Sequence, residues 1–368
     1  MSSTREKTTH GQDLRILVIN PGSTTTKMAV YENETPLFEE TIHYGSEDFA
    51  YLDSPIDQCE RRTNDVLAVL DKHGIAPEDL NAVVGRGGLV RPLVSGTYLI
   101  NDQMMADLAS GEYGMHACNL GGIIARTLGD AYDLPAYVVD PVVVDELWPQ
   151  ARVTGIPGIV RRTSFHALNS KAVSRRCASE LGRSYEECNF VVAHMGGGVT
   201  VSAHRQGRVV DVNNAIEGEG PMSPERCGGA PLDGVIRMCF DGKHTQEQMV
   251  RLQNGTGGIK AYLGTSDMRE VETMIDAGSE EAALLHDACA YQIAKEIGAM
   301  VAALDAPVDA IILTGGLAKS DRFVAAVQRR VERLAPVFVY PGEDELLALA
   351  QGALRVLRGE EKAKTYGA

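Results

Sequence analysis

One structural unit occurs twice in this sequence, roughly half a chain apart. Each copy combines three short apolar runs with two polar turns, and the first turn of each copy carries glycine, a pattern typical of antiparallel strands. The copies span residues 14–42 and 189–212, with strands expected over 14–19, 26–31, 37–42, 189–194, 199–204 and 208–212. Because these units alternate with helical stretches, the sequence predicts two similar α/β domains with mixed sheets flanked by helices.

The turn between the first two strands is rich in groups that can hold an anion. Residues 20–27, called the first turn, read Asn-Pro-Gly-Ser-Thr-Thr-Thr-Lys. Backbone N–H groups and hydroxyls donate hydrogen bonds to phosphoryl oxygens, and Lys27 adds a point charge. A Walker A loop is excluded because the GxxxxGK[ST] spacing is absent and a strand follows instead of a helix. The segment predicts a phosphate turn, with an ordinary polar hairpin turn as the alternative.

Two further glycine turns strengthen this interpretation. The corresponding turn of the second copy, residues 194–198, is called the second turn and contains three consecutive glycines. Consecutive glycines let the backbone come close to an anion and adopt positive φ without steric cost. Gly315 and Gly316 end the apolar run 310–313 and precede a helical stretch. Two opposed phosphate turns and a Gly-Gly turn at a helix start predict a nucleotide cleft between the two domains.

The composition limits the classes of partner. The chain has 368 residues, of which 44% are hydrophobic and 23% charged, which suits about two globular domains. Its formal net charge is −15 and it contains no basic stripe, so nucleic acid and anionic membrane surfaces are poor partners. A protein of this charge that binds a polyanion needs local positive charge, so arginines and lysines near the glycine turns become informative.

Cysteine usage and the terminal segments favour a cytoplasmic protein. The seven cysteines are an odd number, scattered, and include no CxxC pair, which argues against a disulfide framework or a structural zinc site. Residues 1–12 contain no apolar core of a signal peptide, and no apolar run reaches membrane-spanning length. Residues 1–12 and 359–368 are expected to be frayed tails.

The order of elements predicts the domain boundaries. The first domain is expected over residues 13–165, completed by a C-terminal helix over 345–358, and the second over 166–344. Apolar periodicity and helix stop signals predict the remaining elements. Helices are expected over 56–72, 104–111, 119–128, 167–181, 233–241, 245–254, 268–275, 280–304, 320–334 and 345–357, strands also over 82–85, 136–140, 310–313 and 336–341, and loops over 152–164, 218–229 and 254–264.

Two arginines stand among glycines, one in each predicted domain. Arg86 directly follows the apolar run 82–85 and precedes two glycines, and Arg226 lies in the sequence Glu-Arg-Cys-Gly-Gly. A guanidinium at such a position can make bidentate contacts with a phosphate or a carboxylate. The alternative for each is an ordinary surface arginine on a turn.

Histidines and carboxylates also stand at the ends of expected elements. A single histidine is more often a satisfied structural residue than a catalyst, but three at element ends favour a pocket: His116, His166 and His194. Asp140 ends a strand and is a candidate for a metal-side carboxylate. Helix capping is the alternative for the acids at the start of the last helix, which are Glu343, Asp344 and Glu345.

Taken together, these residues resemble the butyrate kinase branch of the acetokinase family, within the actin/hexokinase/Hsp70-like ATPase superfamily. The similarity extends over roughly residues 14–357, nearly the whole chain. The combination of motifs is specific although each motif alone is not. They lie at 20–27, 85–91, 96–98, 116–121, 139–146, 165–169, 193–198, 213–229 and 314–316.

The resemblance implies an actin-like (ribonuclease H-like) fold and reversible phosphoryl transfer from ATP to a short-chain carboxylic acid, giving an acyl phosphate and ADP, with Mg²⁺. It also implies a homodimer or larger homo-oligomer. By position, the phosphate and nucleotide contacts fall on Asn20, Ser23, Thr25, Lys27, His194, Gly196, Gly197, Gly198, Gly315 and Gly316. Catalytic roles fall on Arg86, Arg226, His116, His166 and Asp140. Metal-associated roles fall on Asp140, Asn20 and Glu345, with Asp344 or Glu343 as alternatives to Glu345.

The identity of the acid and the competing functions stay open at this point. The resemblance favours butyrate, then isobutyrate or another branched acid, then acetate or propionate. Two methylenes between acetate and butyrate are worth about 1.6 kcal/mol of burial. A sugar kinase of the same superfamily would need a base to deprotonate a hydroxyl, and it would not need two arginines at the acceptor. An actin- or Hsp70-like binding module would need a polymerisation surface or a peptide-binding domain, for which no residues are left over.

Overall fold

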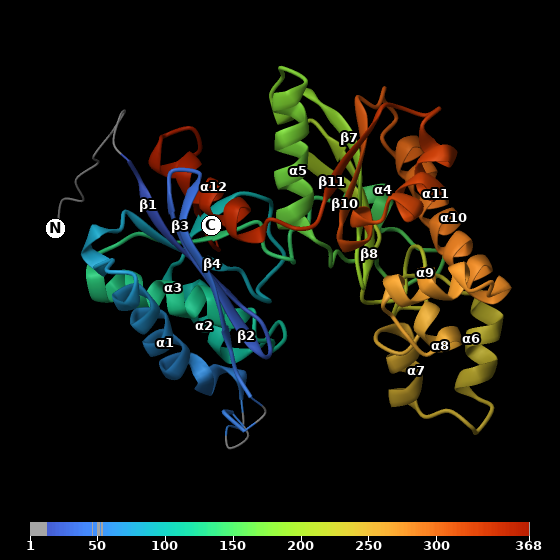
Figure 1. Cartoon of the computed structure of the whole chain (residues 1–368), viewed down its shortest axis with the longest axis horizontal. Coiled ribbons are helices and arrows are strands. Elements are labelled where there is room, and N and C mark those ends of the chain that lie inside the picture. Colours follow the sequence, from blue (N-terminus) through green and yellow to red (C-terminus); the bar gives the residue numbers. More distant parts are fainter. Residues whose placement is uncertain (1–12, 46, 50–51, 53, 368) are drawn as a thin grey trace. The chain divides into compact units, whose positions relative to one another are not determined.

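The computed structural model describes residues 13–45, 47–49, 52 and 54–367, and it divides into two compact units (Figure 1). Unit 1 runs to Val144 and resumes at Asp344, and unit 2 spans Asp145–Glu343. The predicted domain boundary lies after residue 165, so the segment 145–165 belongs to unit 2 instead of to the first domain. Trp148 ties this segment to unit 2, since its backbone N–H donates to Val210 O at 3.0 Å.

Unit 1 contains a mixed sheet of seven strands in the order β12-β5-β6-β4-β1-β2-β3. β1, β2 and β3 form an antiparallel meander, and β4 lies parallel to β1 on its other side. The elements of unit 1 are β1 (Arg15–Pro21), β2 (Thr25–Glu32), β3 (Thr35–His43), η1 (Pro55–Gln58), α1 (Cys59–Lys72), η2 (Pro77–Asp79), β4 (Ala82–Arg86), β5 (Thr97–Leu99), α2 (Asp102–Ser110), α3 (Asn119–Tyr132), β6 (Ala136–Val139), α12 (Glu345–Leu357) and β12 (Lys364–Thr365).

Unit 2 contains a mixed sheet of five strands in the order β11-β10-β7-β8-β9. Here β7, β8 and β9 form the antiparallel meander, and β10 lies parallel to β7. The elements of unit 2 are α4 (Pro149–Arg152), α5 (Ala167–Glu180), η3 (Tyr185–Glu187), β7 (Asn189–Met195), β8 (Val199–Arg205), β9 (Arg208–Val212), α6 (Leu232–Cys239), α7 (Gln246–Gln253), α8 (Ile259–Leu263), α9 (Met268–Asp276), α10 (Glu280–Ala303), β10 (Ala310–Gly315), η4 (Gly316–Lys319), α11 (Asp321–Val331) and β11 (Val337–Pro341).

The two sheets share one topology, which confirms the predicted α/β fold with two similar halves and mixed sheets. The order β6-β4-β1-β2-β3 of unit 1 corresponds strand for strand to β11-β10-β7-β8-β9 of unit 2. In both halves the register shifts between the second and third strands of the meander, at Val30/Tyr31 and at Ala203/His204. The duplicated pattern in the sequence therefore corresponds to a duplicated sheet.

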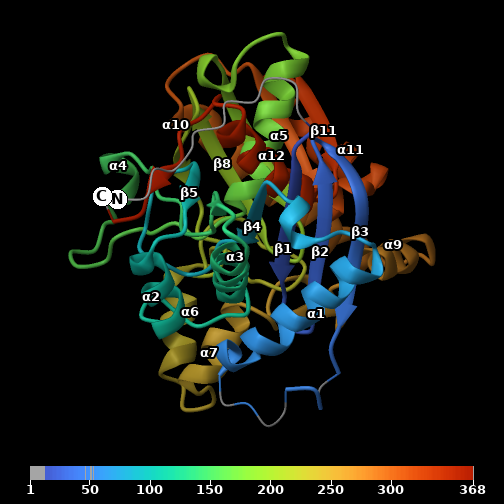
Figure 2. The ribbon, with the colours of Figure 1, turned by 90° about the vertical axis from the view of Figure 1, so that its left-hand side faces the viewer.

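Helices cover both faces of each sheet because successive strand residues point to opposite sides. In unit 2, Val191 and Ile311 pack with α10 and α11 on one face, whereas Val192 and Ile312 pack with α5 on the other (Figure 1). In unit 1, β6 packs against α3 on one face, and Val139 of β6 lies against Gly352 of α12 on the other. Figure 2 shows α1 running beside α3. These strands are apolar on both faces, as expected for a sheet buried between helix layers.

Two sequence-based expectations are wrong in this structure. The predicted loop 254–264 contains the short helix α8, which begins after Gly258 in a left-handed conformation (φ +66°). The C-terminal residues 359–367 are not a frayed tail, because β12 pairs in parallel with β5 and Tyr366 is buried, with its hydroxyl donating to Asp107 Oδ2 at 2.7 Å. Residues 1–12 and 368, which complete the predicted tails, lie outside the described residues.

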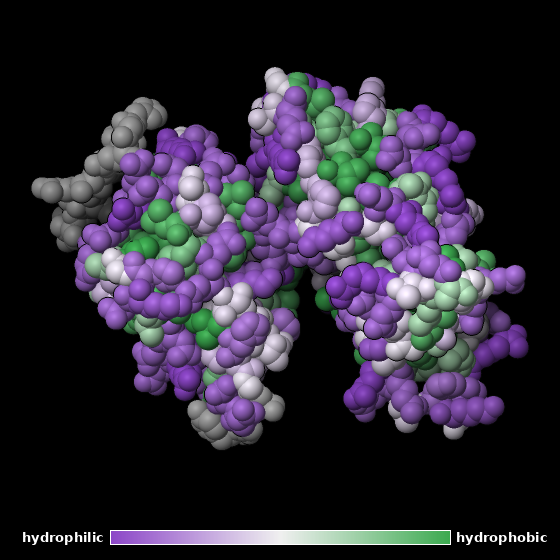
Figure 3. Space-filling model, viewed as in Figure 1, coloured by the Kyte–Doolittle hydropathy of each residue, from purple (hydrophilic) through white to green (hydrophobic). Residues whose placement is uncertain are grey.

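Surface and cysteine properties agree with the composition. The faces of the units seen in Figure 3 are mostly hydrophilic, with separate apolar patches. Across the described residues, no helix is both long enough and apolar enough to cross a bilayer. All seven cysteines carry free thiols. The cytoplasmic location and the homo-oligomeric state stay predictions.

Candidate active site

The first turn joins β1 to β2 in unit 1 and exposes polar groups. Asn20 and Lys27 are direct cross-strand partners, so their side chains emerge on the same side of the hairpin. The turn is closed by a hydrogen bond of 2.7 Å from Gly22 N to Thr25 O. Ser23 and Lys27 are exposed, Thr25 is half-buried and Asn20 is buried. The predicted contact groups of this turn are thus held by a hairpin with a defined register.

Three of the predicted site residues meet in unit 1 although they are far apart in the sequence. Arg86 ends β4 and Glu345 begins α12, and Arg86 Nη1 lies 2.8 Å from Glu345 Oε1. Asn20 Nδ2 donates to Glu345 Oε2 at 2.7 Å. Arg86 Nη1 also donates to Asn20 Oδ1 at 3.4 Å. Of the three acids at the start of α12, Glu345 is therefore the one joined to the first turn.

His116 and Asp140 lie at the ends of other elements of unit 1. His116 is exposed just before α3, and its Nδ1 accepts from the backbone N–H of Cys118 at 3.2 Å, which leaves Nε2 as the proton-bearing nitrogen. Burial raises the pKa of the Cys118 thiol, and the charge of Arg86 opposes this shift. Asp140 is buried with φ +38°, and its Oδ1 accepts from Gly96 N at 2.7 Å.

In unit 2, Arg226 lies directly against the second turn. A Cβ placed on Gly198 would stand 2.0 Å from Arg226 Nη1, so only glycine permits this approach. The guanidinium is held by Asn254 Oδ1 at 2.9 Å from Nε and by Ala215 O at 3.1 Å from Nη1. Burial lowers the pKa of Arg226 from its ordinary value, and Glu225 opposes the shift. The structure thus brings Arg226, which stands close to Gly228 and Gly229 in the sequence, against the second turn.

The predicted histidines of unit 2 form a stacked pair. The rings of His166 and His194 lie 3.7 Å apart and nearly parallel. Asn169 Nδ2 lies 2.9 Å from His194 Nδ1, and His194 Nε2 lies 3.0 Å from Glu343 Oε1 without forming a hydrogen bond. The acids that the sequence left as alternatives therefore lie at different turns. Glu343 lies at the second turn and Glu345 at the first.

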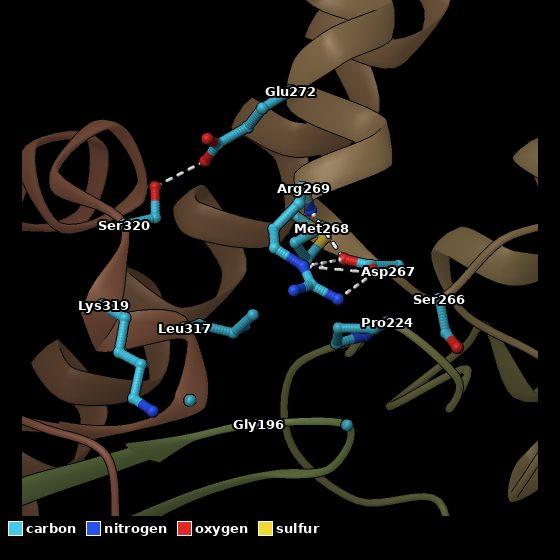
Figure 4. A pocket seen from close by; sticks show the side chains of 12 residues that line it. Gly196, Pro224, Ser266, Asp267, Met268, Arg269, Glu272, Leu317, Lys319 and Ser320 are labelled. Carbon is cyan, nitrogen blue, oxygen red and sulfur yellow. Dashed lines mark hydrogen bonds and ion pairs between the residues drawn. The ribbon is translucent and has the colours of Figure 1, made fainter.

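A cavity of about 470 Å³ opens beside the second turn in unit 2 (Figure 4). Gly196, Gly197 and Gly316 line it, so the second turn and one of the two later glycines that are predicted to contact the nucleotide border the same space. Gly315 directly precedes Gly316 in the sequence and adopts φ +89°. A Cβ at Gly315 would not fit, because it would stand 2.4 Å from Met195 O. This volume lies in the range of small-molecule sites, about 300–1,000 Å³.

Several residues of these sites escaped the sequence reasoning. Asp267, Arg269 and Lys319 line the cavity, and Figure 4 shows Lys319 on the side opposite Asp267 and Arg269. Arg269 Nη2 pairs with Asp267 Oδ2 at 2.6 Å. Arg62 of α1 is fully buried beneath the first turn. None of these residues stands in a glycine-rich motif, so only the tertiary structure connects them with the turns.

The oxygen ligands available in unit 1 fit a Mg²⁺ ion that is bound mainly through water and phosphate. Mg²⁺ usually takes one or two protein carboxylates, keeps several waters and uses substrate phosphates as further ligands. Glu345 and Asn20 offer carboxylate and amide oxygens next to the first turn. Among the described residues no three or more His, Cys, Asp or Glu side chains are grouped to hold a metal ion. One carboxylate beside one amide oxygen matches the few protein ligands that Mg²⁺ takes when substrate phosphates supply others.

The duplicated mixed sheets define the chain as a two-domain α/β protein of actin-like fold, with a glycine turn in the meander of each half. The family model described as the Acetokinase family matches residues 155–339, half of the chain. The chain therefore belongs to the Acetokinase family, and it is an ATP-dependent carboxylate kinase.

Solved structures of similar fold agree with this placement. An acetate kinase from Porphyromonas gingivalis superposes with a TM-score of 0.76 at 21% identity, over 94% of this chain and 100% of that one. An acetate kinase from Entamoeba histolytica gives 0.74 at 16% identity, over 92% and 99%. A propionate kinase from Francisella tularensis subsp. tularensis gives 0.71 at 19% identity, over 92% and 98%. At these identities the similarity establishes the fold.

Proposed function

We propose that this kinase transfers the γ-phosphoryl group of ATP to butyrate, reversibly, forming butyryl phosphate and ADP. The observation that carries the phosphoryl-transfer site is the contact of Arg226 with Gly198, which places a guanidinium on a glycine turn. The preference for butyrate rests on the motifs shared with the butyrate kinase branch, including residues 139–146 and 165–169.

The chemistry needs charge neutralisation more than proton transfer. A carboxylate acceptor is already ionised near neutral pH, so no strong base has to activate it. Its approach to a phosphate is opposed by about 4 kcal/mol at 4 Å for an effective dielectric constant of 20. Arg86, Arg226, Lys27 and the N–H groups of the two turns are the groups that we assign to offsetting this repulsion and to stabilising the equatorial oxygens in the transition state.

The metal-associated residues complete this assignment. Bound Mg²⁺ would neutralise charge on the β- and γ-phosphates. We assign Asn20, Glu345 and Asp140 to holding it or its water shell. Glu345 would accept hydrogen bonds from the water shell of the ion, while the guanidinium of Arg86 paired with it keeps further N–H donors for an anion.

His116, His166 and His194 are assigned to orienting the substrates. His116 offers an Nε2–H donor at the surface of unit 1. His166 is fixed by its stacking on His194 and by Thr200 Oγ1, 3.1 Å from its Nδ1. A neutral imidazole N–H can donate to a phosphoryl or carboxylate oxygen without adding another full charge.

The cavity beside Gly316 is the proposed site of the nucleoside. We expect Gly316→Leu to raise KM for ATP about tenfold with a smaller change in kcat, because the added side chain occupies binding space on a face that is open within 4 Å. Steady-state kinetics with varied ATP measures this. Gly234→Leu on α6, where the added side chain also meets open space, is the matched control. An unchanged KM for ATP in the Gly316 variant would remove the cavity from the assignment.

Acyl specificity is tested by trapping the acyl phosphate with hydroxylamine across acids of two to five carbons, straight and branched. We expect the highest kcat/KM with butyrate. Two fewer methylenes should lower kcat/KM for acetate about 15-fold, the equivalent of about 1.6 kcal/mol of burial. Higher kcat/KM with isobutyrate would assign the branched acid instead. Absence of hydroxamate with every acid, while a sugar is phosphorylated, would favour the sugar kinase alternative.

A further inference from the structure

Arg62 is a fully buried arginine on α1, and all of its donors are used. Nη1 donates to Thr25 O and to Thr26 Oγ1, both at 2.8 Å. Nη2 donates to Ser23 O at 3.2 Å and to Gln58 Oε1 at 2.7 Å, and Nε donates to Gln58 Oε1 at 3.0 Å. Three of these five hydrogen bonds end on the first turn, where a phosphate is expected to bind.

On the backbone of the first turn, Arg62 contacts carbonyl oxygens and not N–H groups. Ser23 O and Thr25 O accept from the guanidinium, and Thr24 O accepts from Tyr44 N at 3.0 Å. Three consecutive carbonyl oxygens are therefore occupied by donors from α1 and from Tyr44, the residue that follows β3. Carbonyl oxygens carry partial negative charge and repel a phosphoryl group, whereas the N–H groups of a turn attract it. Holding the carbonyls in this way keeps the anion-binding side of the turn formed before the ligand arrives.

The charge of Arg62 has a second effect. The guanidinium lies over the ring of Tyr44, with Cζ 4.4 Å from the centroid. Burial lowers the pKa of Arg62, while Tyr44 and Asp65 oppose the shift, and an arginine stays protonated under all ordinary conditions. A positive charge that water screens poorly thus lies behind the first turn and favours an anion in front of it.

Arg62 also has a structural role. Replacing it by an apolar side chain would leave the carbonyl oxygens of Ser23 and Thr25 without this donor, which costs stability. Arg61, its neighbour in the sequence, is exposed and forms an ordinary i,i+4 pair with Asp65 at 3.1 Å. The reason to give Arg62 a further role is therefore its contacts with the first turn and not its burial.

We propose that Arg62 is a positioning residue that pre-forms the first turn for the phosphates of the nucleotide and adds a fixed positive charge behind it. The inference rests on the proposed phosphoryl transfer and extends it to a residue outside the glycine motifs. Arg62 acts through the backbone of Ser23–Thr26 and not by touching the substrate.

The test compares Arg62→Met, Arg62→Lys and the control Arg61→Met in the full-length protein. For Arg62→Met we expect kcat/KM for ATP to fall about 100-fold, the loss typical of a displaced binding group, while the affinity for adenosine, whose site lies in unit 2, changes less than about twofold. Arg62→Lys should recover part of the loss, because it restores the charge but not the planar fork. Arg61→Met should behave as wild type.

Two further measurements make the outcomes decisive. Calorimetric binding of ATP and adenosine separates phosphate recognition from nucleoside recognition, and added guanidinium ion should restore activity to Arg62→Ala. If Arg62→Met does not fold, the Arg62→Lys variant and its kinetics decide. The proposal is overturned if Arg62→Lys keeps wild-type kcat/KM, or if ATP and adenosine affinities fall in parallel. A wild-type protein that forms no acyl hydroxamate would instead reject the proposed function.

Discussion

Arg226→Ala should lower kcat for butyryl phosphate formation by about 10³-fold while leaving the affinity for ADP close to that of the wild type. An arginine that stabilises the moving phosphoryl group is worth about this factor in phosphoryl transfer. The side chain lies against Gly198 and is fixed by Asn254 and Ala215, so its charge is pre-oriented at the second turn. Steady-state kinetics and calorimetric binding of ADP measure the two quantities.

The control for this variant is Arg237→Ala in the same unit. Arg237 lies on the surface of α6 and forms an exposed pair with Asp233, so its loss should change neither kcat nor ADP affinity. An Arg226→Ala enzyme with wild-type kcat would reject the role assigned to Arg226. Equal losses in kcat and in ADP affinity would indicate a binding residue instead.

Gly198→Ala should lower kcat about 100-fold through the same arginine. The new Cβ would stand 2.0 Å from Arg226 Nη1 and 2.5 Å from Cζ, so the guanidinium has to move. A displacement of about 1 Å at a reacting centre can cost a factor of this size. The measurement is kcat of the single variant and of the double variant Gly198→Ala with Arg226→Ala. Because both changes act on one contact, the double variant should be no slower than Arg226→Ala alone.

Gly234→Ala is the matched control for this glycine substitution. Gly234 lies on α6 with open space around it, so alanine there fits the helix and should leave kcat unchanged. Additive losses in the double variant would show that Gly198 and Arg226 act separately. That result would contradict the contact on which the proposed site depends.

Most of the fold follows from local patterns in the sequence. The meanders β1–β3 and β7–β9 agree with the expected strands within about two residues, because alternating apolar residues and polar turns determine hairpin register locally. The helix expected over 280–304 is α10. Ser279 caps its N-terminus by accepting a hydrogen bond from Ala282 N. Helix α8 was missed because it has only five residues and little room for a periodic pattern.

The C-terminal segment shows why some elements need tertiary information. Residues 359–367 are polar enough to suggest a tail, yet β12 adds to the sheet edge beside β5 and Tyr366 enters the core of unit 1. The hydroxyl of Tyr366 meets Asp107, which is 259 positions away. No local pattern encodes a pairing at that separation.

The candidate site, like the fold, was only partly predictable from the sequence. Its glycine turns and the residues within them are evident from the sequence, because a run of glycines, hydroxyls and charged groups between strands has few structural explanations. Which acid at the start of α12 meets the first turn was left open, and the fold places Glu345 there while Glu343 meets His194. Glu345 is the first residue of α12, whereas Glu343 precedes the cap residue Asp344, so the local sequence does not show which of the two faces the first turn.

By itself the sequence determined the duplicated α/β architecture and the positions of the two glycine turns, since these depend on spacings within short segments. The class of chemistry followed from the resemblance that the motifs carry together. Only the tertiary structure decided which distant side chains complete the turns: Glu345 against Asn20 and Arg86, Arg226 over Gly198, and the buried Arg62 beneath the first turn. The physical reason is that backbone turns form from neighbouring residues, whereas the charged side chains beside them come from distant helices, strand ends and loops whose placement depends on the whole core.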